Sequence, residues 1–269
     1  LVSTLEGHPD VIQSLTWNSD ATRLAAGGYR SVLVWNTSNW KLTTTLSQPL
    51  EGRITGIAFL LDKTTLIIAD GATSLRGLLH RWKLGDSKPT QTIEAHADNI
   101  VSLAISQDGK QVATGAADNL AKVWEASSFK ERAKIEGHVG HITALAFSPD
   151  GKWLTTGSAD KDLKVWDIDS KEMIMLLGDK SSGVNALFWT ADASSLTYFT
   201  ESGRVEKVTE LKKHDGVRLA FTSGKQKKLT KLDDVPNAAV MSSDGKTIFA
   251  ALHGGGVVKI DEKASLTNL

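Results

Sequence analysis

Short runs of hydrophobic residues recur along the chain, and a polar turn follows most of them. Six segments share this pattern, which predicts a first strand in each unit, at residues 11–17, 54–59, 100–105, 142–147, 184–189 and 236–241. Successive first strands begin 43, 46, 42, 42 and 52 positions apart. A nearly constant step of this size indicates repeats of one supersecondary unit.

Each unit is predicted to contain four short strands. The third unit has the runs IVSLAI, VATGA, AKVWEA and RAKIEG, and the fourth has ITALAF, LTTGS, LKVWDI and EMIMLLG. The apolar first runs are typical of a strand buried on both faces. Gly, Pro and Asp in QDGK and SPDGK supply turn chemistry. Because no amphipathic helical stretch separates the strands, a fold of alternating strands and helices is disfavoured.

Several of these residues resemble the WD-repeat family. They are the pairs Gly7-His8 and Gly137-His138, the SPDG turn, and LKVWD ending at Trp166-Asp167. The resemblance extends over essentially the whole chain and implies an all-β fold, a WD-repeat β-propeller with six visible blades. It implies one domain over residues 1–269.

In that family a His, a Ser or Thr, an Asp and a Trp form a buried hydrogen-bonded network in each regular blade. Two units carry these residues at offsets of 18, 22 and 28 from the His: His96, Thr114, Asp118 and Trp124, then His138, Thr156, Asp160 and Trp166. The Asp accepts from the His, the hydroxyl bridges and the indole N–H donates, so each buried polar group is satisfied.

The other units depart from this pattern. At the corresponding offsets from His8 the first unit has Ala26 and Arg30, so its network is expected to be broken although Trp35 remains. The second unit has Trp82 but no His near Gly52, and the last two units lack both residues. Those two blades are expected to depend on packing. Trp17, Trp153 and Trp189 are expected to pack between blades.

The fifth unit leaves two alternatives for its third strand, residues 203–210 or residues 216–221. Arg204 to Lys231 contains nine Lys and Arg against three Asp and Glu, and a solvated rim insertion explains this surplus. The chain is expected to be a fragment of a longer protein. Residues 1–6 then belong to a blade of a seven-bladed parent, while residues 264–269 supply the outer strand of the sixth unit.

A narrower resemblance involves the runs LAAGGYRSVLVW, ADGATSLRGLLHRW and YFTESGRVEKVTELKKHDG. They are similar to propellers of large planctomycete and verrucomicrobial proteins, which are fused to cytochrome-c-like domains. This resemblance implies an accessory module of a redox or hydrolytic protein in the bacterial periplasm, with the haem motif outside this chain. Without it, a cytoplasmic protein is expected.

Composition and charge exclude several classes of function. The chain has 31 Lys and Arg against 31 Asp and Glu, which disfavours nucleic acid as a partner. No apolar run reaches the roughly 18 residues of a membrane helix, so membrane insertion is not expected. There is no cysteine, which removes disulfides and thiolate chemistry.

The motifs of catalysis and cofactor binding are missing as well. The sequence has no HExxH, nucleophile elbow or phosphate loop, so no catalytic residue, metal, cofactor or small-molecule substrate is expected. His96, His138, Asp118 and Asp160 are explained by the repeated network, since an active site occurs once and a structural device recurs.

The favoured hypothesis is therefore a non-catalytic scaffold that binds other proteins, or other domains of the same parent chain. By resemblance to the family, contacts concentrate on the face bearing the loop before each inner strand and the turn before each third strand. Those positions are Tyr29, Arg30, Arg53, Asn99, His141 and Lys161.

Overall fold

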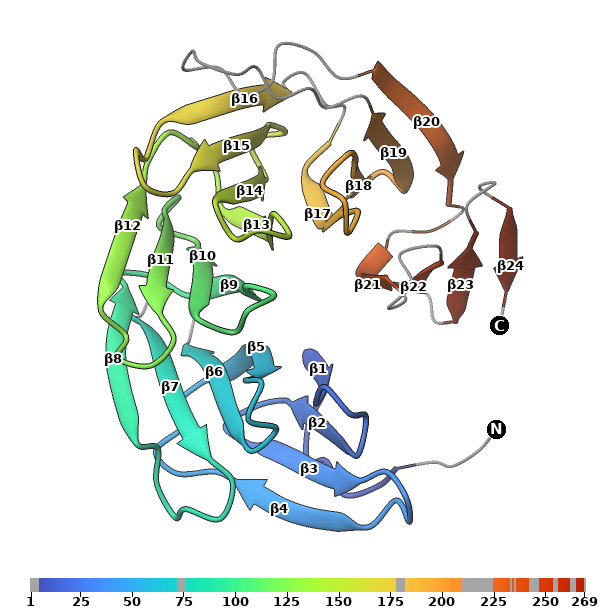
Figure 1. Ribbon diagram of the computed structural model, residues 1–269. Coiled ribbons are helices and arrows are strands. Elements are labelled where there is room, and N and C mark those ends of the chain that lie inside the picture. The colour runs from blue at the N-terminus through green and yellow to red at the C-terminus, as the bar shows by residue number, and fades with distance from the viewer. Residues whose placement is uncertain are drawn as a thin grey trace. The chain divides into compact units, whose positions relative to one another are not determined.

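The computed structural model describes residues 5–71, 76–177, 182–209, 225–232, 234, 236–241, 247–253, 256–261 and 265–268. All regular elements among them are strands, which form six four-stranded antiparallel sheets. In each sheet the strands follow one another in chain order (Figure 1). The sheets are the predicted blades, because short apolar runs separated by tight turns favour meanders of this kind. The chain divides into two compact units, Leu1–Glu131 and Arg132–Leu269.

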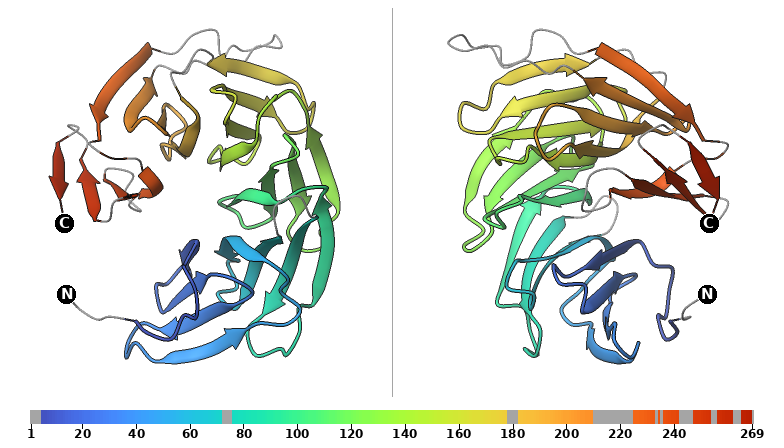
Figure 2. Two further views of the ribbon diagram at one scale, coloured as in Figure 1. Left: turned by 180° about the vertical axis from the view of Figure 1, so that it is seen from behind. Right: turned by 45° about the vertical axis from the view of Figure 1, so that its right-hand side comes forward.

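The strands of the first three blades match the repeats read from the sequence, and all of these strands but the last lie in the first unit. The strands are β1 (Ser14–Trp17), β2 (Arg23–Gly27), β3 (Val32–Asn36), β4 (Leu42–Leu46), β5 (Arg53–Phe59), β6 (Thr65–Gly71), β7 (Gly77–Lys83), β8 (Gln91–His96), β9 (Ile100–Ile105), β10 (Gln111–Ala116), β11 (Ala121–Glu125) and β12 (Glu131–Ile135). The unit boundary falls at the first residue of β12. In the two blades that lie wholly within this unit, the first strands β1 and β5 lie on one side and the last strands β4 and β8 on the other (Figures 1 and 2).

The second unit repeats the same blade three more times. Its strands are β13 (Ile142–Phe147), β14 (Trp153–Ser158), β15 (Leu163–Asp167), β16 (Met173–Leu177), β17 (Val184–Trp189), β18 (Leu196–Thr200), β19 (Arg204–Thr209), β20 (Lys225–Lys231), β21 (Pro236–Met241), β22 (Ile248–Leu252), β23 (Val257–Ile260) and β24 (Leu266–Asn268). Four predicted first strands, those of the third to sixth units, match the structure at both ends.

Apolar layers between neighbouring blades hold each unit together. In the first unit one layer joins Val34 of β3 to Ile54 of β5 and Leu66 of β6, and another joins Ile67 of β6 to Ile100 of β9. In the second unit Val165 of β15 packs in one cluster with Val184 of β17. The second strand of a blade is the most buried, with every residue of β6, β10, β14 and β18 buried.

Four details differ from the sequence-based expectations. The first strands β9 and β13 are partly buried rather than buried on both faces. Each is an edge strand of its sheet, whereas the second strand is an interior one. The first strand of the chain begins at Ser14 rather than Val11, which is 69% exposed. Trp153 and Trp189 pack together as expected, with ring centroids 6.3 Å apart. Trp17 does not pack between blades, since it is 47% exposed and meets Trp40 edge to face.

The fourth difference concerns the basic stretch of the fifth blade. Its two ends, Arg204–Thr209 and Lys225–Lys231, are paired blade strands rather than a rim insertion. The third strand is therefore the 203–210 alternative, and residues 216–221 lie outside the described part of the chain. In the sixth blade Leu266–Asn268 pairs with Val257–Ile260 and supplies the fourth strand, as expected. Residues 1–4 of the expected outer strand 1–6 lie outside the described residues.

Candidate functional site

The third blade brings His96, Thr114, Asp118 and Trp124 together. His96 Nδ1 lies 3.0 Å from an Asp118 carboxylate oxygen, and His96 Nε2 lies 2.8 Å from Thr114 Oγ1. The Trp124 indole N–H donates to the same hydroxyl oxygen at 2.8 Å. Because an ionised carboxylate only accepts, the imidazole proton belongs on Nδ1, and the Thr114 hydroxyl donates to Nε2.

The fourth blade repeats this arrangement with its own four residues. His138 Nδ1 lies 2.7 Å from Asp160, and His138 Nε2 lies 2.8 Å from Thr156 Oγ1, which accepts from Trp166 at 2.9 Å. Asp160 also accepts from two backbone amides, those of Val139 at 3.0 Å and Asp162 at 2.9 Å. The carboxylate therefore ties the loop before the first strand to the turn before the third.

A lysine completes both networks, and sequence reasoning missed it. Lys122 Nζ donates to the carbonyl of Ala95 at 2.6 Å, and Lys164 Nζ donates to the carbonyl of Gly137 at 2.6 Å. Each carbonyl belongs to the residue just before the network His. Both lysines stand 26 positions after that His, so comparing the two repeats would have revealed them.

The pKa values of these groups follow from burial and hydrogen bonding. Burial alone raises the pKa of Asp118 and Asp160, but their hydrogen bonds to His and backbone amides outweigh it and leave both pKa values below the usual range. Burial lowers the pKa of His138, against the opposing influence of Asp160. In the fourth blade the resting state is therefore a neutral His138 imidazole beside an ionised Asp160 carboxylate.

Acid is therefore expected to destabilise the fourth blade in two stages. His138 has a folded pKa below its unfolded value of about 6.5, so its contribution to stability is complete above that pH and is lost as the pH falls. Asp160 contributes above about pH 4 and loses its contribution below it. Urea midpoints measured between pH 8 and pH 3 should fall with pH. His138→Gln should flatten the part just below about pH 6.5. An unchanged slope there would contradict the assignment.

The first two blades lack this network. In each blade one residue of the second strand pairs with the Trp of the third strand, and the network hydroxyl is expected two positions after that residue. This position, which is Thr114 in the third blade, is Ala26 in the first blade and Ile68 in the second. Without a hydroxyl there, the Trp82 indole N–H donates instead to the backbone carbonyl of Asp86 at 3.0 Å. His8 Nδ1 lies 3.0 Å from the carbonyl of Asp10.

The second blade has a different buried network, which no repeated sequence pattern predicted. Asp70 and His80 are both fully buried, with His80 Nε2 3.3 Å from Asp70 and His80 Nδ1 2.8 Å from Thr92 Oγ1. The two Asp70 oxygens accept from the amides of Glu51 and Gly52, each at 2.7 Å. Asp70 therefore fixes the loop that leads into β5.

Of the candidate binding face, the first unit carries Tyr29, Arg30, Arg53 and Asn99. Tyr29 is 48% exposed and forms an isolated bridge with Arg53, which starts β5 and pairs with Gly71. A Cβ added at Gly71 would lie 3.0 Å from Asn99 Oδ1. The Arg30 amide donates to the carbonyl of Gly52 at 2.7 Å. Tyr29 and Arg30 lie between β2 and β3, Arg53 begins β5, and Asn99 immediately precedes β9.

The second unit carries His141 and Lys161 in two adjoining loops, and both are exposed. The His141 carbonyl accepts from Ala159 at 3.0 Å, and Lys161 N donates to Ser158 at 3.2 Å. Val139 in the same loop is 87% exposed, more than any other large apolar side chain described. Sequence reasoning missed Val139, although an apolar residue between two histidines of a polar loop was a usable signal.

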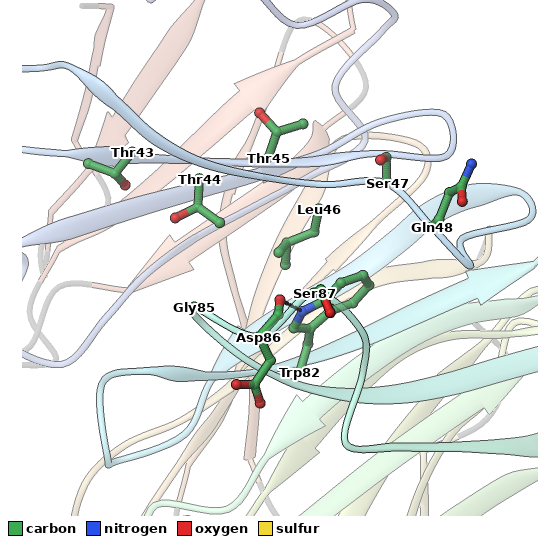
Figure 3. Close-up of a pocket in the computed structure, with 10 residues that line it drawn as sticks. All are labelled: Thr43, Thr44, Thr45, Leu46, Ser47, Gln48, Trp82, Gly85, Asp86 and Ser87. Atoms are coloured by element: carbon green, nitrogen blue, oxygen red, sulfur yellow. Dashed lines mark hydrogen bonds between the residues drawn. The ribbon is translucent and has the colours of Figure 1, made fainter.

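A polar hollow of about 380 Å³ lies elsewhere in the first unit, between β4 and the turn after β7 (Figure 3). It is lined by Thr43, Thr44, Thr45, Leu46, Ser47, Gln48, Trp82, Gly85, Asp86 and Ser87. Among the residues that the structure describes, no group of three or more His, Asp or Glu is placed to hold a metal ion. The described part of the chain has no helix long and apolar enough to cross a membrane.

Comparison with known proteins identifies three of the repeats. The family model described as WD domain, G-beta repeat matches residues 1–36, 87–125 and 129–167. Protein FIZZY-RELATED 3 of Arabidopsis thaliana is 26% identical over 118 residues, which are 42% of this chain and 24% of that protein. THO complex subunit 3 of the same plant is 27% identical over 119 residues, 42% of this chain and 36% of that protein.

The aligned regions thus span well under two thirds of either relative. Neither the family match nor these relatives bears on the narrower resemblance to bacterial propellers, which stays a prediction. The second and third matched repeats each contain the fourth strand of one blade and the first three strands of the next, and they include every residue of the two His–Thr–Asp–Trp networks. The chain therefore contains WD repeats and is built from β-propeller blades.

Proposed function

We propose that the chain is a non-catalytic scaffold for protein–protein contacts, which it makes through the loops at one end of its blades. The observation that carries this proposal is how its polar residues are used. The side chains best suited to acid–base chemistry, His96, His138, Asp118 and Asp160, bond to one another in the same pattern in successive blades. A repeated network stabilises a repeated fold, whereas a reaction site is built once.

Exposed side chains supply the contact surface in this proposal. Tyr29 and Arg53 in the first unit belong to the residue types enriched at binding hot spots, and the exposed Val139 beside His141 and Lys161 adds an apolar anchor in the second unit. One of the similar proteins is named as a subunit of a complex, which agrees with a role in assembly. The proposed partners are other proteins or other domains of the parent chain.

Variants of this surface test the proposal. Tyr29→Ser with Arg53→Glu, and separately Val139→Ser with Lys161→Glu, should abolish capture of partners from an extract of the source organism. They should also weaken the affinity for an identified partner, measured by calorimetry, by at least about tenfold, because truncation of a hot-spot side chain costs about 2 kcal/mol or more of binding free energy. Lys110→Glu is the matched control, since Lys110 is 82% exposed and lies in a turn away from these loops. If both double variants still capture the same partners, this face is not the contact surface.

The non-catalytic part of the proposal has its own test. A panel of hydrolase and redox substrates should give no saturable turnover with the purified chain. Turnover that a single His or Asp substitution removes, in protein that still melts at the wild-type temperature, would overturn it.

A further inference from the structure

The polar hollow of the first unit combines two features that a peptide could use. One wall is β4, the last strand of its sheet, and the opposite wall is the turn Gly85–Ser87 between β7 and β8 (Figure 3). Leu46 and Trp82 lie beneath it and are almost fully buried, with 2% and 1% of their surface exposed. The accessible lining is therefore polar and is made of hydroxyl, amide and carboxylate groups.

Most of these polar side chains have no partner of their own. Among the residues that the structure describes, six of the lining side chains make no hydrogen bond or ion pair: Thr44, Thr45, Ser47, Gln48, Asp86 and Ser87. Thr43 differs, because its hydroxyl donates to the carbonyl of Val34 at 2.9 Å. Polar side chains without partners thus line one hollow.

Asp86 is unusual among the turn residues of this chain. In the other turns after a third strand, the residue after the Trp uses its side chain to close the turn, as Asn36, Glu125 and Asp167 do. In the second blade that position is Lys83, and backbone groups close the turn. The Asp86 amide donates to the Lys83 carbonyl, and the Trp82 indole N–H donates to the Asp86 carbonyl. The backbone of Asp86 is held at both ends, while its carboxylate is left for another molecule.

The edge of β4 lacks the devices that usually block pairing with another strand. Edge strands are commonly protected by charged residues, especially Lys, or by Pro. β12 contains Glu131, Arg132 and Lys134, and the sequence of β20 contains four lysines. β4 reads LTTTL, with neither charge nor Pro, and its β-branched residues favour an extended partner.

We propose that an extended peptide segment adds to the free edge of β4 and places a Lys or Arg side chain in the hollow against Asp86. Main-chain hydrogen bonds along a sheet edge supply affinity in this mode of recognition, and a pocket beside the edge supplies specificity. Asp86 is the one charged residue in the lining, so a basic side chain is the complementary one. This site is separate from the loop surface proposed above, and neither proposal depends on the other.

Selection and binding measurements test this site. A phage library of random 12-residue peptides is panned on the purified chain, and selected peptides are synthesised with a fluorescent label for polarisation titrations. The peptides should contain β-branched residues around one Lys or Arg. Asp86→Asn should weaken them by about tenfold or more, as expected for a lost charge-assisted hydrogen bond. Every second backbone N–H of a bound peptide strand would pair with the edge of β4. Methylation of that alternate set of backbone nitrogens should therefore abolish binding, whereas methylation of the other set should not.

Matched variants separate the possible outcomes. Asp169→Asn, in the corresponding turn of the fourth blade, and Leu176→Lys on the edge strand β16 should leave affinity unchanged, whereas Thr44→Lys should reduce it. Tyr29→Ser with Arg53→Glu should also leave it unchanged, so this proposal and the loop surface can fail independently. The proposal is overturned if no peptide is selected, if affinity is indifferent to Asp86→Asn and Thr44→Lys, or if the hollow binds neutral saccharides instead.

Discussion

Asp70→Ala is expected to lower the free energy of unfolding by about 3 kcal/mol, the largest effect of any single substitution considered for this chain. Asp70 is fully buried and satisfies three donors at once, the amides of Glu51 and Gly52 and the ring of His80. Alanine leaves all three without this acceptor, two of them at buried positions and the Glu51 amide at a partly buried one. Each buried group that loses its partner costs about 1–3 kcal/mol.

Urea unfolding of the wild type and the variant measures this effect. Asp169→Ala is the control, because Asp169 is 76% exposed and its ion pair with Arg132 should contribute at most about 1 kcal/mol. His80→Ala combined with Asp70→Ala should cost clearly less than the sum of the two single changes, since the residues share one network. A loss below about 1 kcal/mol for Asp70→Ala would contradict the network.

The same carboxylate also connects stability to the proposed contact surface. Gly52 receives a hydrogen bond from the Arg30 amide at its carbonyl and donates its own amide to Asp70. Arg53, the next residue, bridges to Tyr29. Three of the candidate binding residues therefore depend on a loop that Asp70 fixes, although Asp70 itself is out of reach of any partner.

The strands were predictable because their signals are local and repeated. A period of 42 residues relates the third and fourth blades, and the apolar runs at 100–105 and 142–147 coincide with β9 and β13. The two regular networks were predictable for the same reason, since identical offsets of 18, 22 and 28 place the same four residues in equivalent positions. The family match covers these two repeats as well.

The Asp70–His80–Thr92 network could not be predicted, because it occurs in one blade alone among those described. His80 pairs with Ile68, the residue that replaces the network hydroxyl, and only this pairing brings it near Asp70. The prediction that Trp17 packs between blades was wrong for a related reason. Its alternation with polar neighbours identified a strand, but the alternation alone does not say which face of β1 is covered.

Asp160→Ala in the fourth blade carries the second large effect, an expected loss of about 1–3 kcal/mol. The substitution removes the acceptor for His138 and for the amides of Val139 and Asp162. The loss should be smaller than for Asp70→Ala, because the Asp160 side chain is 5% exposed while that of Asp70 is 0% exposed. Water can therefore replace more of the lost bonding at Asp160 than at Asp70.

Arg30→Ala provides the contrast, since Arg30 stands where the first blade would need its network Asp. Its guanidinium donates one long hydrogen bond, from Nε to the carbonyl of Leu50 at 3.3 Å, so its loss should stay within about 0.5 kcal/mol. Thermal and urea unfolding of both variants measure the difference. Equal losses would mean that blade packing, and not the His–Thr–Asp–Trp network, stabilises the fourth blade. A clear difference would show that this network adds stability in a blade that has it.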